Sequence, residues 1–410
     1  MRIRHRALGR VGAWGFVAST TAYSALGVAG KVLGEGVNAV GPLLLLASMV
    51  CCGLVFVGYR SSQRLPVPPH YAAFVGAVSL AAMVGVAVAN PPRIVAFDMM
   101  TYGTVAAFLW AGRSDELWAD LRWPVIIFTA IALLLAALYT DPHTAIERSL
   151  LRLQPTYSLQ SAFWLSLIIL LRSSGQWETK YFVALFSVTT TQLALLLTFS
   201  KRAPSTRVAL FALVALFLRG RKSSVRQMAV IASTALVAAL AVRSALPWMA
   251  GLGTTWNRVE DTEFFSADQN IRWLEARDLV SELTPFEVVF GKGLGGYFVD
   301  SPLGIWDQLG GSTFGRTSMH VGLFVPLMKG GLVLAVAYNL LLIATVFRRV
   351  DARTERYMLP LRLGALIILA FSLIEGPADF SSLQLAAAIG LVGSAGSGRG
   401  VEQSGRGATG

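Results

Sequence analysis

The chain contains Asn270-Ile271-Arg272-Trp273, then Phe290-Gly291-Lys292-Gly293-Leu294-Gly295-Gly296, then Met319-His320-Val321-Gly322. These motifs belong to one polar segment, Trp248 to Met319, which is flanked on both sides by long apolar runs. Each run approaches the length of about 20 residues that a helix needs to cross the hydrocarbon core of a bilayer. An arginine-bearing polar segment between such helices predicts a functional site at one face of a membrane.

The composition of the whole chain favours the same class of protein. Of the 410 residues, 54% are hydrophobic and 14% are charged, and the mean hydropathy is +0.59. Soluble domains carry about 25% charged residues. A soluble fold would have to bury many helices that have almost no polar face. We therefore expect an all-α, polytopic membrane protein.

The apolar runs predict about twelve transmembrane helices, each with uncertain ends. These spans are 11–30, 40–58, 71–90, 93–112, 123–140, 157–171, 181–199, 204–219, 225–247, 319–347, 357–374 and 380–394. The run 319–347 is long enough to tilt or to begin as a re-entrant segment. The expected division is residues 1–247 for the first nine helices, 248–318 for one large external loop, 319–394 for the last three helices and 395–410 for a disordered cytoplasmic tail.

The net charge of +12 has a simpler explanation than a nucleic-acid partner, because basic residues mark the cytoplasmic loops of membrane proteins. If the N-terminus is cytoplasmic, the inside segments hold more Lys and Arg residues than the outside segments. The long loop then lies outside, and we expect no nucleic-acid partner. The sequence has no Cys/His spacing typical of a zinc site.

Basic residues on the predicted outer side gather in two places. They are Lys201, Arg202 and Arg207 between two helices, and Arg258, Arg272, Arg277, Lys292 and Arg316 in the long loop. The planar guanidinium group binds two oxygens at once, so such clusters suit phosphate or pyrophosphate groups. Contacts with lipid headgroups or with acidic neighbours are the alternative explanation.

Residues 268–283 predict an external helix within this loop. Trp273 and Arg277 are spaced to share one face, and Leu279 and Leu283 to share another that can pack onto the membrane helices. The helix could hold an arginine toward a cleft, or it could act only as a lid or a packing element.

The pattern G-x-G-x-x-G occurs from Gly291 to Gly296. It marks a dinucleotide site only between a strand and a helix, a context that this sequence lacks, so we expect a tight turn instead. His320 lies where the next apolar run begins, and its side chain could accept a proton from a hydroxyl group. A structural role for His320 is the alternative.

Three segments, taken in order, resemble the bacterial O-antigen ligase and O-antigen polymerase superfamily. Leu197-Thr198-Phe199-Ser200-Lys201-Arg202-Ala203 is similar to the family's Thr-x-Ser-Arg-Gly-Ala segment. Arg272-Trp273 through Phe290-Gly291-Lys292-Gly293-Leu294-Gly295 is similar to its Arg…Trp…Gly-x-Gly run. His320-Val321-Gly322 with Lys329-Gly330-Gly331 is similar to its His-Asn-x-x-Leu…Gly-Leu-x-Gly segment, with Val321 where the family usually has Asn. The resemblance covers mainly residues 180–350.

This resemblance implies a fold like that of C-type glycosyltransferases, in the inner membrane of a bacterium. The substrate would be a glycan on a polyprenyl pyrophosphate, and the enzyme would need no metal or cofactor. Membrane lipid, a flippase and a chain-length regulator are the other implied partners. The implied catalytic residues are His320, which would activate the acceptor hydroxyl, and Arg272 or Arg277; the implied pyrophosphate-binding residues are Lys201, Arg202, Arg207 and Arg316.

The motifs do not separate a polymerase, which extends the chain on its lipid carrier, from a ligase, which transfers it to lipid A-core. The His-Val-Gly and Gly-Lys-Gly-Leu-Gly variants favour a polymerase. A transporter or flippase is the alternative from another class, and it would place ionisable residues deep in the membrane. Such residues are few inside the predicted spans, where Asp98 and Lys329 are the main ones, and the polar residues gather in the outer loop instead. A structural scaffold would explain the apolar helices but not the outer arginines.

Overall fold

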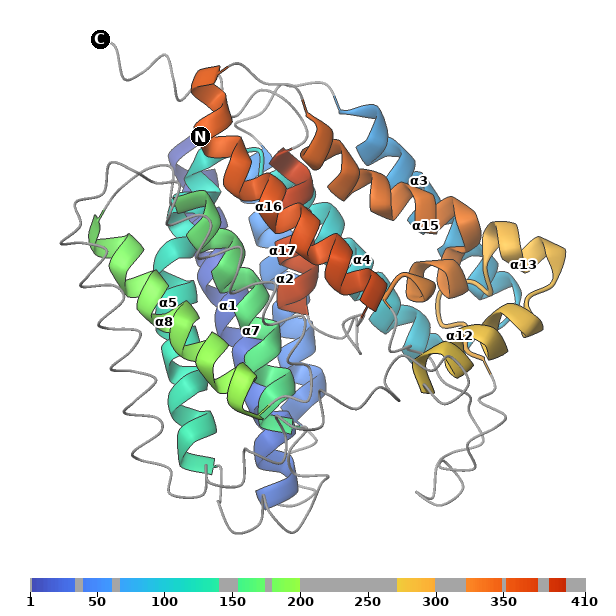
Figure 1. Cartoon of the computed structure of the whole chain (residues 1–410), viewed down its shortest axis with the longest axis horizontal. Helices are drawn as coiled ribbons and strands as arrows, with labels where there is room; N and C mark the ends of the chain where they lie inside the picture. Colours follow the sequence, from blue (N-terminus) through green and yellow to red (C-terminus); the bar gives the residue numbers. More distant parts are fainter. Residues whose placement is uncertain are drawn as a thin grey trace.

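The computed structural model is a bundle of α-helices (Figure 1). It describes residues 2–33, 40–60, 67–139, 154–173, 179–199, 271–298, 322–348, 352–374 and 383–395. These residues form helices, turns and short connections, with no strand among them. The predicted all-α class is therefore confirmed for the described part of the chain.

The helices follow the apolar runs closely. They are α1 (Arg2–Leu33), α2 (Val40–Arg60), α3 (Pro69–Ala87), α4 (Pro92–Ala111), α5 (Asp115–Tyr139), α7 (Gln154–Ser173), α8 (Thr179–Phe199), α12 (Ile271–Glu282), α13 (Pro285–Phe290), α15 (Phe324–Phe347), α16 (Ala352–Ile374) and α17 (Leu383–Ala395). A helix is present in every predicted span except 204–219 and 225–247, which lie outside the described residues.

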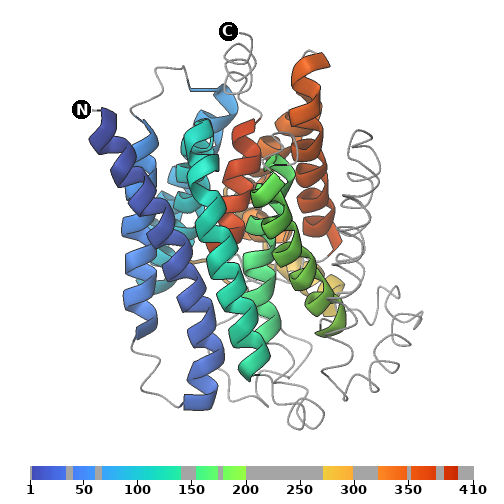
Figure 2. The ribbon, with the colours of Figure 1, turned by 90° about the vertical axis from the view of Figure 1, so that its left-hand side faces the viewer.

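Among the described residues, five helical segments are long and apolar enough to cross a membrane. They are Val40–Tyr59, Pro69–Ala87, Pro92–Ala111, Asp115–Leu134 and Phe324–Phe347. The long helices run roughly parallel to one another when the molecule is seen from the side (Figure 2). These are the features of a polytopic membrane protein, and the full set of twelve spans stays a prediction.

Small residues let α1 and α2 approach closely. A Cβ atom on Gly12 would lie 2.7 Å from the backbone nitrogen of Val55 and 2.8 Å from the carbonyl oxygen of Cys51. Polar side chains add bonds between helices, since the amide nitrogen of Gln384 in α17 donates to the hydroxyls of Thr20 and Thr21 in α1. Close approach at small residues and such interhelical bonds are how helices associate in lipid.

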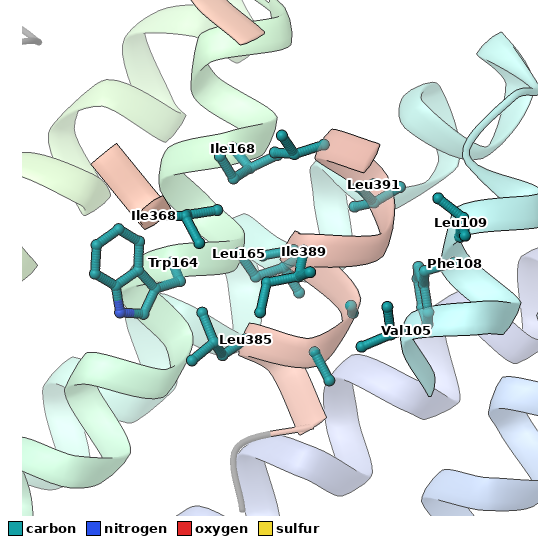
Figure 3. Packing of buried hydrophobic residues seen from close by; sticks show 14 of the residues in the cluster. Val105, Phe108, Leu109, Trp164, Leu165, Ile168, Ile368, Leu385, Ile389 and Leu391 are labelled. Carbon is teal, nitrogen blue, oxygen red and sulfur yellow. The ribbon is translucent and has the colours of Figure 1, made fainter. Parts of the chain in front are cut away.

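Helix α17 lies at the centre of the bundle, and all of its residues are buried. Its apolar side chains, including Leu385 and Ile389, pack between α4 and α7 (Figure 3). Phe108 of α4 and Trp164 of α7 belong to the same core. This central helix places the C-terminal third of the chain against the N-terminal helices.

Charged side chains join α1, α2 and α5 near the N-terminus. The buried carboxylate of Asp120 accepts bonds from Arg10 Nε at 3.0 Å, Arg10 Nη2 at 2.9 Å and Tyr59 Oη at 2.8 Å. The Arg172 guanidinium donates to Asp115 Oδ1 at 2.7 Å and also lies over the Trp118 ring. The end of the bundle that holds the N-terminus is therefore rich in arginine.

Candidate functional site

Most of the predicted site residues lie outside the part of the chain that the structure describes. The exceptions are on α12, where the backbone of Arg272 and the whole of Arg277 are described. The residues outside are Lys201, Arg202, Arg207, Arg316 and His320. Their roles stay predictions.

Helix α12 buries one face and exposes Arg277. The side chain of Leu279 is fully buried, and Leu283 packs partly against the core, as expected from their spacing. The Arg277 side chain is 66% exposed, and its Nε lies 3.9 Å from Oδ1 of the neighbouring Asp278. The helix therefore presents a guanidinium group on the surface, where it can meet an anionic ligand.

A short helix, α13, separates α12 from the glycine-rich motif. Its N-cap is Thr284, whose hydroxyl accepts a bond from the Glu287 amide at 3.3 Å, while the Glu287 carboxylate accepts from the Thr284 amide at 2.9 Å. Because a helix precedes the motif, the structure lacks the strand that a dinucleotide site requires at this place. The expected tight turn is confirmed, since Gly291, Gly293 and Gly295 all have positive φ angles.

Residues 291–296, which we call the glycine segment, are wedged between α3, α4 and α15. A Cβ atom on Gly293 would collide with the backbone of Gly85 in α3, and one on Gly85 would collide with the carbonyl of Leu294. A Cβ atom on Gly291 would collide with the backbone of Gly330 in α15. Glycine is therefore the residue that allows these backbones to approach so closely.

Hydrogen bonds hold the backbone of the glycine segment in place. The Lys292 amide donates to the Met328 carbonyl at 2.8 Å, and the Leu294 amide donates to the Ala81 carbonyl at 2.9 Å. The side-chain amide of Asn90 donates to the carbonyls of Lys292 and Leu294, at 2.8 and 2.9 Å. The segment is thus fastened to α3, to the turn that follows it and to α15.

Next to the glycine segment, Asp98 of α4 and Lys329 of α15 form an ion pair. Lys329 Nζ is 2.8 Å from Asp98 Oδ2, and the two side chains are 1% and 14% exposed. The same Oδ2 atom accepts a bond from the Gly295 amide at 2.7 Å. Lys329 Nζ also donates to the Gly296 carbonyl at 2.8 Å. Both charges are therefore compensated by each other and by peptide groups of the glycine segment.

This pair changes the interpretation of the two ionisable residues. In the sequence they stood out only as the main ionisable residues inside the predicted spans, with no partner assigned to either. In the structure they are partners, and each lies in the second turn of its helix rather than at the helix centre. A signal was present in the sequence, because a lone Asp and a lone Lys in different apolar runs can share one site.

Helix α15 is interrupted next to Lys329. Gly330 and Gly331 have non-helical φ/ψ angles of −142°/20° and 60°/−161°. The interruption admits the end of α13, because a Cβ atom on Gly331 would collide with the Val289 carbonyl. The candidate span Phe324–Phe347 falls within the predicted run 319–347 and contains this kink, which the adjacent glycines could have indicated.

The glycine segment connects two parts of the chain. One is α12, which carries Arg277, and the other is the start of α15, the helix that follows His320 in the sequence. Lys292 adds a second connection, since its Nζ lies 3.0 Å from Glu282 Oε2 at the end of α12. Within the described ranges, no group of three or more His, Cys, Asp or Glu residues could hold a metal ion. In the described part of this region, Arg277 offers an exposed guanidinium group.

Comparison of the chain with protein-family models, with curated proteins and with solved structures finds no match. The resemblance to the O-antigen ligase and polymerase superfamily therefore depends on the three motifs and their order.

Proposed function

We propose that this protein polymerises oligosaccharide repeats carried on a polyprenyl pyrophosphate, at the outer face of a bacterial cytoplasmic membrane. One structural observation supports it most. The glycine segment fastens α12, which carries Arg277, to the start of α15, which directly follows the His320 motif. The described residues next to the two motifs, on α12 and at the start of α15, therefore lie at one end of the bundle.

The proposed reaction needs a base and a positive site for the leaving group. His320 takes the proton of the acceptor hydroxyl, and the resulting oxygen attacks the anomeric carbon of the donor glycan with inversion. The bond between that carbon and the pyrophosphate oxygen breaks, and the pyrophosphate keeps the bonding electrons. Arg272 or Arg277, together with Lys201, Arg202, Arg207 or Arg316, stabilises the charge that develops on it.

The orientation that this function requires has the N-terminus in the cytoplasm. Arg10 and Arg172 lie at the end of the bundle that holds the N-terminus, in keeping with the positive-inside rule. The orientation is tested by labelling a Ser312→Cys variant with an impermeant thiol reagent. Labelling of intact cells supports it, whereas labelling only after lysis would invert it.

An O-antigen ligase is the alternative within the same class, since it would use the same donor and another acceptor. A transporter is the second alternative, and the buried Asp98–Lys329 pair is the observation that favours it. Both members of the pair are bonded to the glycine segment, which explains their burial without transport. A flippase and a chain-length regulator are the partners that a polymerase would need.

The test is the length distribution of the polysaccharide in cells that carry single substitutions. His320→Ala and Arg272→Ala should abolish long polymer while membrane levels of the protein stay normal, because loss of a general base alone slows a reaction by about 10²–10⁴-fold. Arg93→Ala is a matched control, since Arg93 is an exposed arginine at the same end of the bundle and belongs to no motif. Normal polymer in both variants would rule out the assigned site.

A further inference from the structure

Helix α13 (Pro285–Phe290) is short, apolar and exposed. The side chains of Phe286, Val288 and Val289 are 57%, 37% and 39% exposed, and Glu287 is the single charged residue of the helix. The Glu287 carboxylate closes the capping box with Thr284. The polar groups are thus at the N-terminal end of the helix, and the rest of its surface is apolar.

Helix α13 lies against two candidate membrane spans, α3 and α15. Helix α13 contacts α15 and α3, and it lies beside them at the edge of the molecule (Figure 1). At its C-terminal end α3 exposes Met83 and Val86, which are 61% and 71% exposed. After its kink α15 exposes Leu332 and Val336, which are 49% and 55% exposed. Exposed apolar side chains on candidate spans are suited to contact with lipid, and those of α13 are of the same kind.

The backbone that follows α13 packs against the interior of a candidate span. The Leu294 amide bonds to the Ala81 carbonyl, six residues before the end of the candidate span Pro69–Ala87. Six residues of α-helix correspond to about 9 Å. A chain at this depth cannot rely on water, so its peptide groups must be paired within the protein.

Most peptide groups of the glycine segment are paired with protein atoms. The amides of Gly291, Lys292, Leu294, Gly295 and Gly296 all donate to protein oxygens. The carbonyls of Lys292, Gly293, Leu294 and Gly296 all accept bonds from the protein. A loop in water would need no such pairing, whereas irregular backbone in a membrane is tolerated when the protein surrounds it.

We propose that residues 285–298 form a re-entrant membrane segment, with the exposed face of α13 in contact with the acyl chains of the surrounding lipid. The glycine segment then turns inside the protein, above the Asp98–Lys329 pair. This region was expected to lie in a large aqueous loop at 248–318. The inference does not depend on the reaction proposed above, and it places α12 and Arg277 next to the membrane surface.

The experiment uses the full-length chain in lipid nanodiscs, with Cys51 and Cys52 replaced by Ala. Nitroxide spin labels are attached at Phe286→Cys and Val288→Cys, and at Ser281→Cys as a control on the exposed surface of α12. Collision with oxygen, which concentrates in lipid, is compared with collision with a water-soluble nickel chelate.

Oxygen should exceed the nickel chelate at both α13 positions, and the order should reverse at Ser281. Nickel collisions that equal or exceed those of oxygen at Phe286 and Val288 would show an aqueous helix and overturn the proposal. Low collision rates with both reagents would show a protein cover and overturn it equally.

Hydrogen exchange of the unsubstituted chain in the same nanodiscs gives a second test that needs no variant. Peptides from residues 291–296 should exchange as slowly as those of α3, because most of their amides are paired and the proposal shields them from water. Exchange within seconds, as in an open loop, would contradict the proposal.

Discussion

The Asp98–Lys329 pair shows how two residues that are costly in a membrane become compatible with it. Removing a charge from water is expensive, and mutual attraction repays this only when the remaining polar atoms are also bonded. Here the Gly295 amide and the Gly296 carbonyl supply those bonds. The pair and the glycine segment therefore depend on each other.

Replacing one member of the ion pair should lower the free energy of unfolding more than replacing both members. We expect Lys329→Met to lower the free energy of unfolding by about 3–5 kcal/mol, because it leaves the Asp98 carboxylate without its counter-ion. The double variant Asp98→Asn, Lys329→Met should lose less than the single variant, because no isolated charge is left. Thermal unfolding in nanodiscs measures both differences.

A matched control is the pair of Lys292 and Glu282, whose side chains are 17% and 29% exposed. Lys292→Met should cost no more than about 1 kcal/mol, as is usual for ion pairs near a surface. The single variants Lys329→Met and Asp98→Asn each lose some free energy of unfolding. If the double variant loses as much as these two losses added together, the charges do not act as a pair.

At the scale of elements, the contact between α3 and the glycine segment needs glycine on both sides. Gly85 and Gly293 meet backbone to backbone, and Gly293 also has a φ angle of +80°. The contact fixes the direction in which the chain leaves α13 and enters the bundle. Because the two backbones are in direct contact, even one added methyl group there should strongly destabilise the protein.

Gly293→Ala should therefore destabilise the protein strongly. The unfavourable φ angle alone costs about 1–3 kcal/mol, and the collision with Gly85 adds to it. Gly76→Ala is the control. Gly76 lies in α3, as Gly85 does, and a Cβ atom on it meets nothing within 4 Å. That control should be neutral or stabilising by up to about 1 kcal/mol, as for Gly→Ala within helices. Equal melting temperatures for the two variants would contradict the described packing.

At the scale of the whole molecule, the sequence predicts the elements better than their contacts. Long apolar runs are sufficient to predict the all-α class and the helices of the described spans, because a chain in lipid must pair its own peptide groups. The glycine turn and the packing of Leu279 were also predictable, since both follow from local geometry.

The pairing of Asp98 with Lys329 was not predicted, because periodicity says which face of a helix is apolar but not which helices are neighbours. The insertion of the glycine segment into the bundle depends on Gly85, one small residue among many in an apolar run. Of the candidate site, the exposure of Arg277 is established, and the role of His320 stays a prediction.

The most direct test of the proposed polymerase is the pool of polyprenyl-linked glycans in cells that lack this chain, measured together with the surface polysaccharide. The proposal predicts that single lipid-linked repeats accumulate, that long chains disappear, and that the wild-type gene restores them while a His320→Ala copy does not. Long chains stranded on the polyprenyl carrier would identify a ligase instead. An unchanged glycan profile would contradict glycan transfer altogether.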